Sequence, residues 1–284
     1  MNKKILIPTD FSKNSLNAVR YIMALYPDRA CSFYLLHSYE VDPFSIRGSA
    51  YILPERGHEP HDIAQRETEE KFRIFLKELS VFTTNTEHRI TTIVTFETLL
   101  KAAKEAVAKQ DIDMIVMGTK GMTGATTLLF GTNAIKLMEG VTECPVLAVP
   151  EHLEIKPPKE IVFPTDYKGP YKKRDLVYMI NIAEKHKSNI CVLHIKKSEQ
   201  LTRNQIEGKA LLESILTNVD HSFHELNTVG VQDGITGFIE SRNSDMIAFT
   251  NQKHSFFSNL FSKPLVKKLG YYSKVPVLVL KHSK

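Results

Sequence analysis

Short apolar runs alternate with longer amphipathic stretches along the chain. Residues 5–7 and 32–37 form two such runs, and each is typical of a strand buried on both faces. Between them, the apolar residues of segment 14–26 recur at helical spacing, and Ser12 or Asn14 could cap the start of that helix. The pattern therefore predicts a strand, a helix and a second strand, in that order.

The same alternation continues to residue 150. We predict a helix at 61–79, a strand at 90–96, a helix at 99–107, a strand at 114–117, a helix at 133–141 and a strand at 146–149. Strands and helices that alternate in this way form parallel sheets with helices on both faces. Ligands of such sheets bind beyond the carboxyl ends of the strands, where the strand order reverses. Attention therefore falls on the residues that follow Ile7 and Met117.

Four motifs of the first half return in the same order in the second half. The matching segments are KILIPTDF at 4–11 and EIVFPTDY at 160–167, Leu36-His37 and Leu193-His194, DMIV at 113–116 and DMIA at 245–248, and CPVLAV at 144–149 and VPVLVL at 275–280. We therefore predict a tandem duplication, with domains at 1–150 and 160–284. The linker is expected at 151–159, because Pro157 and Pro158 can continue neither a helix nor a central strand.

Composition and charge narrow the class of protein. The chain has 284 residues, of which 42% are hydrophobic and 24% charged, as in globular proteins. Its net charge of +5 comes from scattered basic residues, which argues against nucleic acid as a partner. No apolar run approaches the roughly 20 residues that span a bilayer. The start of the chain does not resemble a signal peptide. We expect Cys31, Cys144 and Cys191 to be buried thiols in a reducing compartment. A cytoplasmic location without membrane contact is therefore expected.

A glycine-rich segment follows the fourth predicted strand. It contains Gly118 and Gly121, and nine residues later Gly131 precedes a predicted helix. Glycine permits positive φ and lets phosphate oxygens approach backbone N–H groups. We expect Thr132 to cap the helix, and the N–H groups of Thr132 and Asn133 to face an anion with the helix dipole behind them.

Two charged side chains complete this candidate site. Lys120 would add a mobile positive charge, and Asp10 could accept hydrogen bonds from ribose hydroxyls while Pro8 fixes the chain direction. In the plainer interpretation, the glycines form only a flexible loop and a turn before a helix. Neither Gly-x4-Gly-Lys-Ser/Thr nor Gly-x-Gly-x2-Gly after the first strand is present, so P-loop and dinucleotide-binding folds fit worse.

The spacing Gly-x2-Gly-x9-Gly-Thr, with Pro-Thr-Asp at the first strand and Cys-Pro-Val-Leu before the last, resembles the ATP-binding subgroup of the universal stress protein family. The resemblance covers nearly the whole chain, twice over. It implies an α/β fold of two tandem open parallel five-stranded sheets with helices on both faces, which is Rossmann-like and similar to the adenine nucleotide alpha hydrolases. It also implies that the two copies pair about a pseudo-twofold axis within the chain, and that the chain could form a homodimer.

The resemblance further implies that the first domain binds one ATP, with Mg²⁺ bridging the phosphates. By position, Asp10 would contact the nucleoside, the backbone near Ser38 the adenine, and Gly131 with its neighbours the phosphates. Lys120 stands where the family often has Arg or His. The full set carried over is Pro8, Thr9, Asp10, Ser38, Met117, Gly118, Lys120, Gly121, Gly131, Thr132 and Asn133.

The second copy departs from this motif at its glycines. Thr250, Lys253 and about Ser262 take their places, and Pro264 has no N–H to donate. Side chains then occupy the space that phosphates need. We therefore predict that the second domain does not bind ATP, and that the bulky apolar residues at 256–261 pack at a domain or subunit interface.

Other polar residues carry less weight. His37 and His194 recur at equivalent strand ends, so a structural role is expected for both. His58 and His61 could bind a metal with Glu55 and Glu59, but four such residues in the insertion at 41–60 are more often solvated. No Ser-His-Asp set or carboxylate pair has supporting spacing.

These patterns favour a cytoplasmic stress-response protein that binds ATP in its first domain and acts on a protein partner that the sequence does not identify. The second domain would be its structural or partner-binding mate. Because no base for water is evident, a sensor or at most a slow ATPase is expected. Two alternatives stay open, namely a scaffold that binds no nucleotide and has a vestigial loop, and a hydrolase acting on a small adenylated substrate.

Overall fold

The helices and strands of the first half agree in type and order with those that the hydrophobic pattern predicts. The computed structural model describes residues 2–39, 60–82, 87–119, 130–196, 198–227, 230–250 and 274–281. The elements of the first half are β1 (Lys3–Pro8), α1 (Lys13–Leu25), β2 (Cys31–Ser38), α3 (Pro60–Ser80), β3 (Arg89–Thr95), α4 (Leu99–Gln110), β4 (Met114–Gly118), α5 (Thr132–Gly140) and β5 (Val146–Val149). The insertion predicted at 41–60 lies almost entirely outside the described residues.

The second half repeats this order from β6 to β9, and β10 follows as its last described strand. Its elements are β6 (Glu160–Pro164), α6 (Lys173–His186), β7 (Asn189–Lys196), α7 (Arg203–Leu216), β8 (His221–Asn227), α8 (Val231–Arg242), β9 (Met246–Thr250) and β10 (Val277–Leu280). The segment at 251–273, which includes the bulky apolar residues at 256–261, is outside the described residues.

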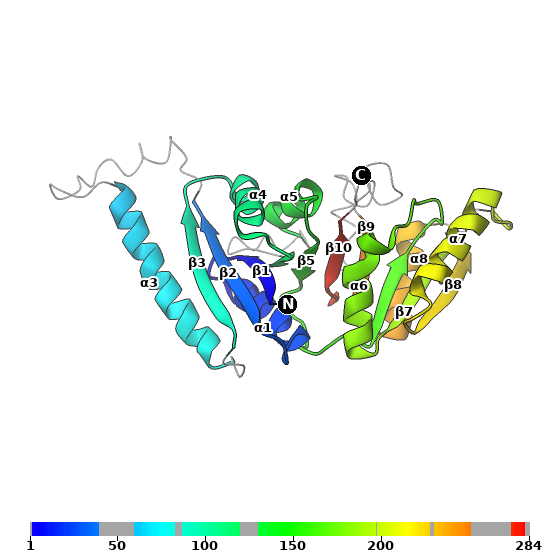
Figure 1. Cartoon of the computed structure of the whole chain (residues 1–284), viewed down its shortest axis with the longest axis horizontal. Coiled ribbons are helices and arrows are strands. Elements are labelled where there is room, and N and C mark those ends of the chain that lie inside the picture. Colours follow the sequence, from blue (N-terminus) through cyan, green and yellow to red (C-terminus); the bar gives the residue numbers. More distant parts are fainter. Residues whose placement is uncertain are drawn as a thin grey trace.

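The ten strands of the described residues belong to one sheet, in the order β3-β2-β1-β4-β5-β10-β9-β6-β7-β8. Read inward from its own edge, each half has the same strand order, and strands pair in parallel within each half. The halves meet where β5 and β10 pair antiparallel, with Leu147 opposite Leu278 (Figure 1). The predicted α/β class with a mostly parallel open sheet is confirmed. The two five-stranded sets are joined as one sheet instead of remaining separate.

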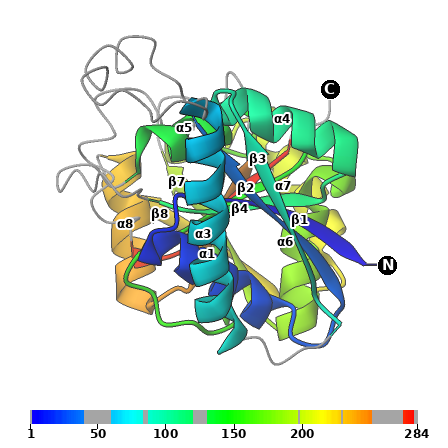
Figure 2. The ribbon, with the colours of Figure 1, turned by 90° about the vertical axis from the view of Figure 1, so that its left-hand side faces the viewer.

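Helices cover both faces of this sheet. On one face, α1 and α6 pack with α3 and α7 in a cluster that includes Ile22, Phe72, Leu176 and Leu212. The other face carries α4, α5 and α8, with Ala103, Leu137 and Ile235 among its buried residues. Figure 2 shows α1 and α4 on opposite sides of the strands. Each cluster contains residues of both halves, so the two copies share their core.

Polar contacts also join the halves beside α1 and α6. The ring Nε2 of His186 lies 2.9 Å from the carbonyl oxygen of Leu25, and the Lys185 ammonium lies 3.6 Å from Asp28. The ammonium of Lys3, in β1, lies over the rings of Tyr26 and Tyr178, which come from opposite halves. These contacts support a single packed unit.

Partly buried histidines predict how stability depends on pH. Burial lowers the pKa of His37, His88, His186 and His224 below its usual value. The unfolded chain therefore binds protons at a higher pH than the folded chain, and the free energy of unfolding should fall as pH drops from about 7 to about 5. Denaturant titrations across this range should show that decline, and His186→Gln should make it shallower. A free energy of unfolding that stays constant or rises would contradict this account.

Candidate functional site

A cleft of about 160 Å³ opens at the carboxyl ends of β1 and β4, beside the start of α5. The strand order reverses between these two strands, which is where the fold class predicts a ligand. Every predicted site residue within the described part of the chain borders this cleft. They are Pro8, Thr9, Asp10, Ser38, Met117, Gly118, Gly131, Thr132 and Asn133. Lys120 and Gly121 lie outside the described residues.

A tight turn after β1 holds Asp10 at the rim. Phe11 has a φ of 64°, which is rare for a residue with a side chain, and its N–H donates to Thr9 Oγ1 over 3.0 Å. The Asp10 carboxylate accepts hydrogen bonds from the N–H of Ser12, over 3.1 Å, and from its hydroxyl, over 2.6 Å. Ser12 in turn caps α1 by accepting from the N–H of Ser15. The helix cap therefore fixes the orientation of Asp10.

The second half builds the same turn. Tyr167 has a φ of 60°, and its N–H donates to Thr165 Oγ1 over 3.0 Å. The side-chain contacts around the turn differ between the copies, since Lys168 replaces Ser12 and offers the Asp166 carboxylate only its backbone N–H. The Thr9 hydroxyl bonds the small Ser15, whereas the Thr165 hydroxyl bonds the phenol of Tyr171. The turn is thus part of the repeated fold, and only its surroundings distinguish the two halves.

His37 lines the cleft but is tied to the turn. Its Nδ1 lies 2.7 Å from the carbonyl oxygen of Thr9, and its ring centroid lies 4.6 Å from that of Phe11. Because a carbonyl only accepts, Nδ1 carries the proton, and burial lowers the pKa of His37. His194 repeats this contact with the carbonyl oxygen of Thr165. The shared geometry agrees with the structural role predicted for both histidines.

Gly118 has a packing role besides its place beside the cleft. A Cβ at this position would lie 2.7 Å from Cγ of Asn14, a buried residue of α1. The glycine therefore makes room for α1 behind the strand, and its predicted contact with the nucleotide stays a prediction. In the second half, Thr250 pairs with Leu280 as Gly118 pairs with Val149, so a side chain replaces the glycine there.

Gly118→Ala should lower the free energy of unfolding by about 1–3 kcal/mol, because the new methyl group overlaps Asn14 in a packed interior. Gly237→Ala provides the matched control, since a Cβ there meets nothing within 4 Å. Gly237 is exposed inside α8, and alanine at such a site should gain about 0.5–1 kcal/mol. Chemical denaturation of both variants measures the difference, and equal effects would refute the packing role of Gly118.

The start of α5 is open toward the cleft. Gly131 is the N-cap, with φ −62° and ψ 155°, and no side chain caps the helix. The expectation that Thr132 caps it is wrong, because Thr132 is already the first helical residue and its backbone has turned into the helix. The first helical N–H groups, at Thr132, Asn133 and Ala134, have no acceptor within the helix. Together with the helix dipole, they make a ready binding site for an anion.

Thr119 also lines the cleft, although the sequence did not point to it. Its N–H donates to Val149 over 3.0 Å, and its carbonyl accepts from the N–H of Gly131 over 2.6 Å. These two bonds tie the end of β4 to the start of α5. Ser15, His37, Leu99 and Ala134 also line the cleft without having been predicted to do so. Ser15, Leu99 and Ala134 lie on helices whose packing the sequence does not reveal, whereas His37 lies at the end of β2, where the repeated Leu-His motif placed it.

Titratable and metal-binding groups are sparse around the cleft. Asp10 and His37 are the acid and the histidine among the described residues that line it. Within the described segments, no three His, Cys, Asp or Glu side chains come together as a metal site. His58 and its neighbours Glu55 and Glu59 lie outside the described residues, as does the side chain of His61. The arrangement thus offers backbone donors and one carboxylate.

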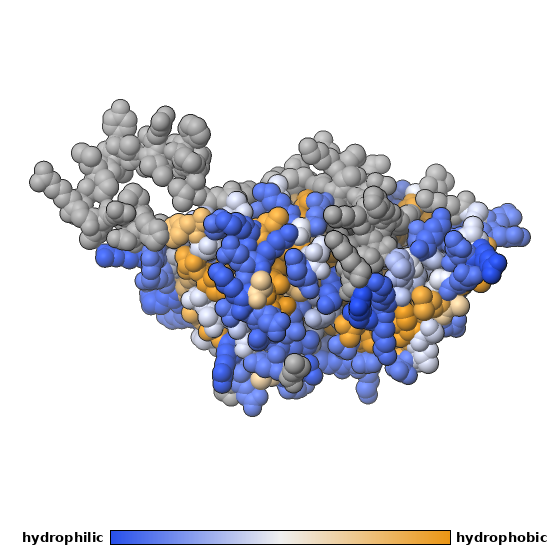
Figure 3. Space-filling view, turned by 45° about the horizontal axis from the view of Figure 1, so that its top comes forward, coloured by the Kyte–Doolittle hydropathy of each residue, from blue (hydrophilic) through white to orange (hydrophobic). Residues whose placement is uncertain are grey.

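Two further expectations can be compared with the structure. Cys31, Cys144 and Cys191 are buried free thiols, as predicted. No helix in the described part of the chain is long and apolar enough to cross a membrane. Figure 3 shows hydrophilic residues over much of the described surface on one face, with apolar residues in smaller groups between them.

Comparisons with known proteins agree with this architecture. The model of the universal stress protein family matches residues 1–150. A universal stress protein of Methanocaldococcus jannaschii is 29% identical over 158 residues, which cover 56% of this chain and 85% of the relative. The crystal structure of a universal stress protein from Archaeoglobus fulgidus DSM 4304 aligns with a TM-score of 0.71 and 16% identity, over 99% of this chain and 97% of that one.

A second solved structure aligns with an equal share of this chain. It is a putative universal stress protein from Pseudomonas aeruginosa UCBPP-PA14, with a TM-score of 0.58 and 15% identity. The alignment spans 99% of this chain and 93% of that one. Because the sequence identities are only 16% and 15%, both structural similarities support the fold alone.

Proposed function

This chain belongs to the universal stress protein family, and from that premise we propose that its first half binds one ATP in the cleft between β1, β4 and α5. The protein would then act as a nucleotide-dependent stress-response protein. We take residues 1–150 and 160–284 as its two domains. The extent of the family match and the place of residues 151–159, between β5 and β6, support these boundaries.

The uncapped start of α5 carries the proposal. Gly131 presents no side chain to the first turn, so the N–H groups of Thr132 and Asn133 stay accessible to phosphate oxygens. An anion at this position also gains from the positive end of the helix dipole. A triphosphate with its charge spread over several oxygens fits a site built from backbone donors better than a neutral ligand does.

The other wall of the cleft suits a nucleoside. Asp10 stands at the rim with its carboxylate oriented by Ser12, and carboxylates readily accept hydrogen bonds from ribose hydroxyls. Met117 and Leu99 supply apolar surface for the base, and the backbone at Ser38 borders the same space.

The residues of the cleft favour binding and release over rapid hydrolysis. Mg²⁺ bound with the nucleotide would neutralise phosphate charge. Asp10 already accepts two hydrogen bonds from Ser12, and the ring of His37 is held by Thr9. A general base must reach the water that it activates. We therefore propose a switch in which ATP shifts the populations of two conformations, with at most slow turnover.

The second half would contribute structure or a surface for a protein partner. Thr250 replaces the glycine of the first copy, and Tyr171 fills the place of Ser15 beside the turn. Both changes add side chains near the equivalent cleft. Lys253, Ser262 and Pro264, which the sequence adds to this argument, lie outside the described residues.

Purified protein provides the first test. Denaturing it should release an adenine nucleotide, identified by its ultraviolet spectrum and mass, in a ratio that approaches one per chain. Protein stripped of nucleotide should bind added ATP again. If no nucleotide is released and none rebinds, the first half is a scaffold with a vestigial loop, and the proposal fails.

A further inference from the structure

A second cavity lies between the two halves, where β5 has ended and β9 and β10 begin. Its volume is about 370 Å³, and it lies beside Asp245 and Val275, which precede β9 and β10. Tyr21 of α1, the connecting segment at 152–156 and the end of α8 complete its walls. Because both copies and the connection between them contribute, a single-domain relative could not form it.

Tyr21 supplies an unsatisfied polar group to this cavity. Its side chain is only 2% exposed, and its hydroxyl has no hydrogen-bond partner among the described residues. Burial and the nearby charge of Asp245 both raise the pKa of Tyr21, so the phenol stays protonated. A buried hydroxyl without a partner lowers stability, unless a ligand or water supplies the bond.

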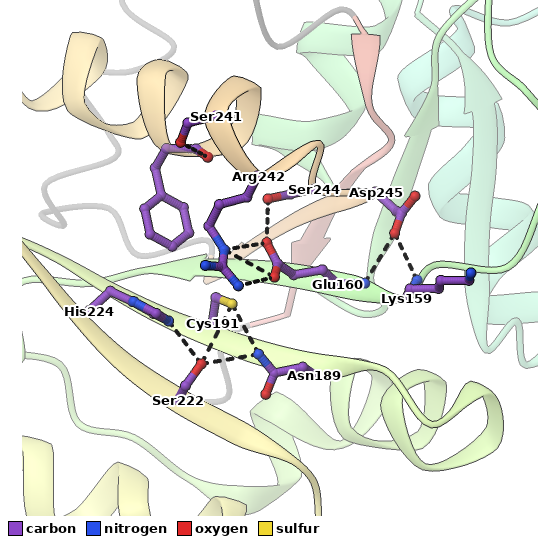
Figure 4. Close-up of polar contacts among 11 residues, drawn as sticks. Lys159, Glu160, Asn189, Cys191, Ser222, His224, Ser241, Arg242, Ser244 and Asp245 are labelled. Carbon is purple, nitrogen blue, oxygen red and sulfur yellow. Dashed lines mark hydrogen bonds and ion pairs between the residues drawn. The ribbon is translucent and has the colours of Figure 1, made fainter.

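Asp245 is a fixed negative charge in the same cavity. Its Oδ2 accepts hydrogen bonds from the backbone N–H of Lys159 over 2.9 Å and of Glu160 over 3.1 Å. Figure 4 shows this pair of bonds beside the network in which Arg242 and Ser244 hold the Glu160 carboxylate. The carboxylate of Asp245 therefore cannot swing away, and its charge faces the cavity.

The remaining walls divide into apolar and charged parts. Leu153, Ile239 and Val275 provide apolar surface. The lining holds three carboxylates, of Glu154, Glu240 and Asp245, against the two ammonium groups of Lys156 and Lys274, with His152 beside them. The C-terminal end of α8 also borders the cavity, and its carbonyl groups favour a positive charge.

We propose that this cavity binds a small amphipathic amine. Its ammonium group donates to the Asp245 carboxylate and to the Tyr21 hydroxyl, and its apolar body packs on Leu153, Ile239 and Val275. The chain already shows the preference of this position for ammonium, since Nζ of Lys156 lies 3.6 Å from Asp245 and 3.0 Å from Glu154. Lys156 is half exposed, so it acts as an internal competitor that a ligand displaces.

Three aromatic probes of similar size test the chemistry of the cavity. Calorimetry or ligand-observed NMR on the full chain should detect saturable binding of benzylamine. Benzyl alcohol and benzoate should bind at least about tenfold more weakly, because the first lacks the charge and the second reverses it. If none of the three binds, an ordered water satisfies Tyr21 and the proposal fails. It fails equally if all three bind alike.

Two variants locate the binding to this cavity. Tyr21→Phe should weaken benzylamine binding about threefold to tenfold, the effect of one hydrogen bond. Lys156→Ala should strengthen it severalfold by removing the competitor. Neither should lower the midpoint of thermal unfolding, since the phenol has no partner and exposed ion pairs contribute little. Benzylamine affinities equal to that of the wild type in both variants would overturn the assignment, whatever the result for ATP.

Discussion

Gly131→Asp should abolish ATP binding while leaving the protein at least as stable as the wild type. An aspartate at the N-cap accepts hydrogen bonds from the first turn of α5, the same N–H groups that we assign to the phosphates. It also places a negative charge beside them, which should weaken binding at least about a hundredfold. Calorimetry with ATP measures the affinity, and thermal unfolding measures the stability.

Two further variants separate these effects. Gly131→Asn caps the helix without adding charge, so its affinity should fall between those of the wild type and the aspartate variant. Thr132→Pro removes a single N–H, and proline is tolerated as the first helical residue. The preceding Gly131, with φ −62° and ψ 155°, already has a backbone that proline permits after it. Wild-type affinity in the aspartate variant would mean that α5 does not hold the phosphates.

Leu278→Ala should destabilise both halves of the molecule together. Leu278 is completely buried on β10, opposite Leu147 of β5, in a cluster that spans the two copies. Truncating a buried leucine leaves a cavity, and the loss should be about 2–5 kcal/mol. Native-state hydrogen exchange should show reduced protection in β1 as well as in β7.

Leu211→Ala makes the same chemical change on α7, where the leucine is 42% exposed, and should have little effect. If the two domains folded independently, Leu278→Ala would affect hydrogen exchange in one domain only. In that case, Leu278→Ala would lower protection in β7 and leave β1 unchanged, and the single packed unit would be refuted.

The repeat and the hydrophobic pattern suffice to predict most of the fold. Short buried runs followed by amphipathic segments leave a parallel α/β sheet as the natural outcome, and the structure agrees. The hydrophobic pattern could not predict that β5 and β10 pair with each other. Both strands are short and apolar throughout, so they show no alternation of exposed and buried positions that would reveal which neighbour or direction they prefer.

The candidate site divides in a similar way. The sequence shows which residues follow the predicted strands, and for that reason Asp10 and Gly131 could be predicted as residues of the candidate site. Contacts between distant segments are not, so the packing of Asn14 against Gly118 and the link through Thr119 emerged only from the structure. Likewise, a shift of one residue in the start of α5 decides whether Thr132 caps the helix or offers its N–H to a ligand.

The number of nucleotides bound per chain tests the central claim most directly. Titrating nucleotide-free protein with ATP and Mg²⁺ in a calorimeter should give a single class of site with a stoichiometry of one. A chain that takes up two equivalent nucleotides, or none at all, would contradict the account.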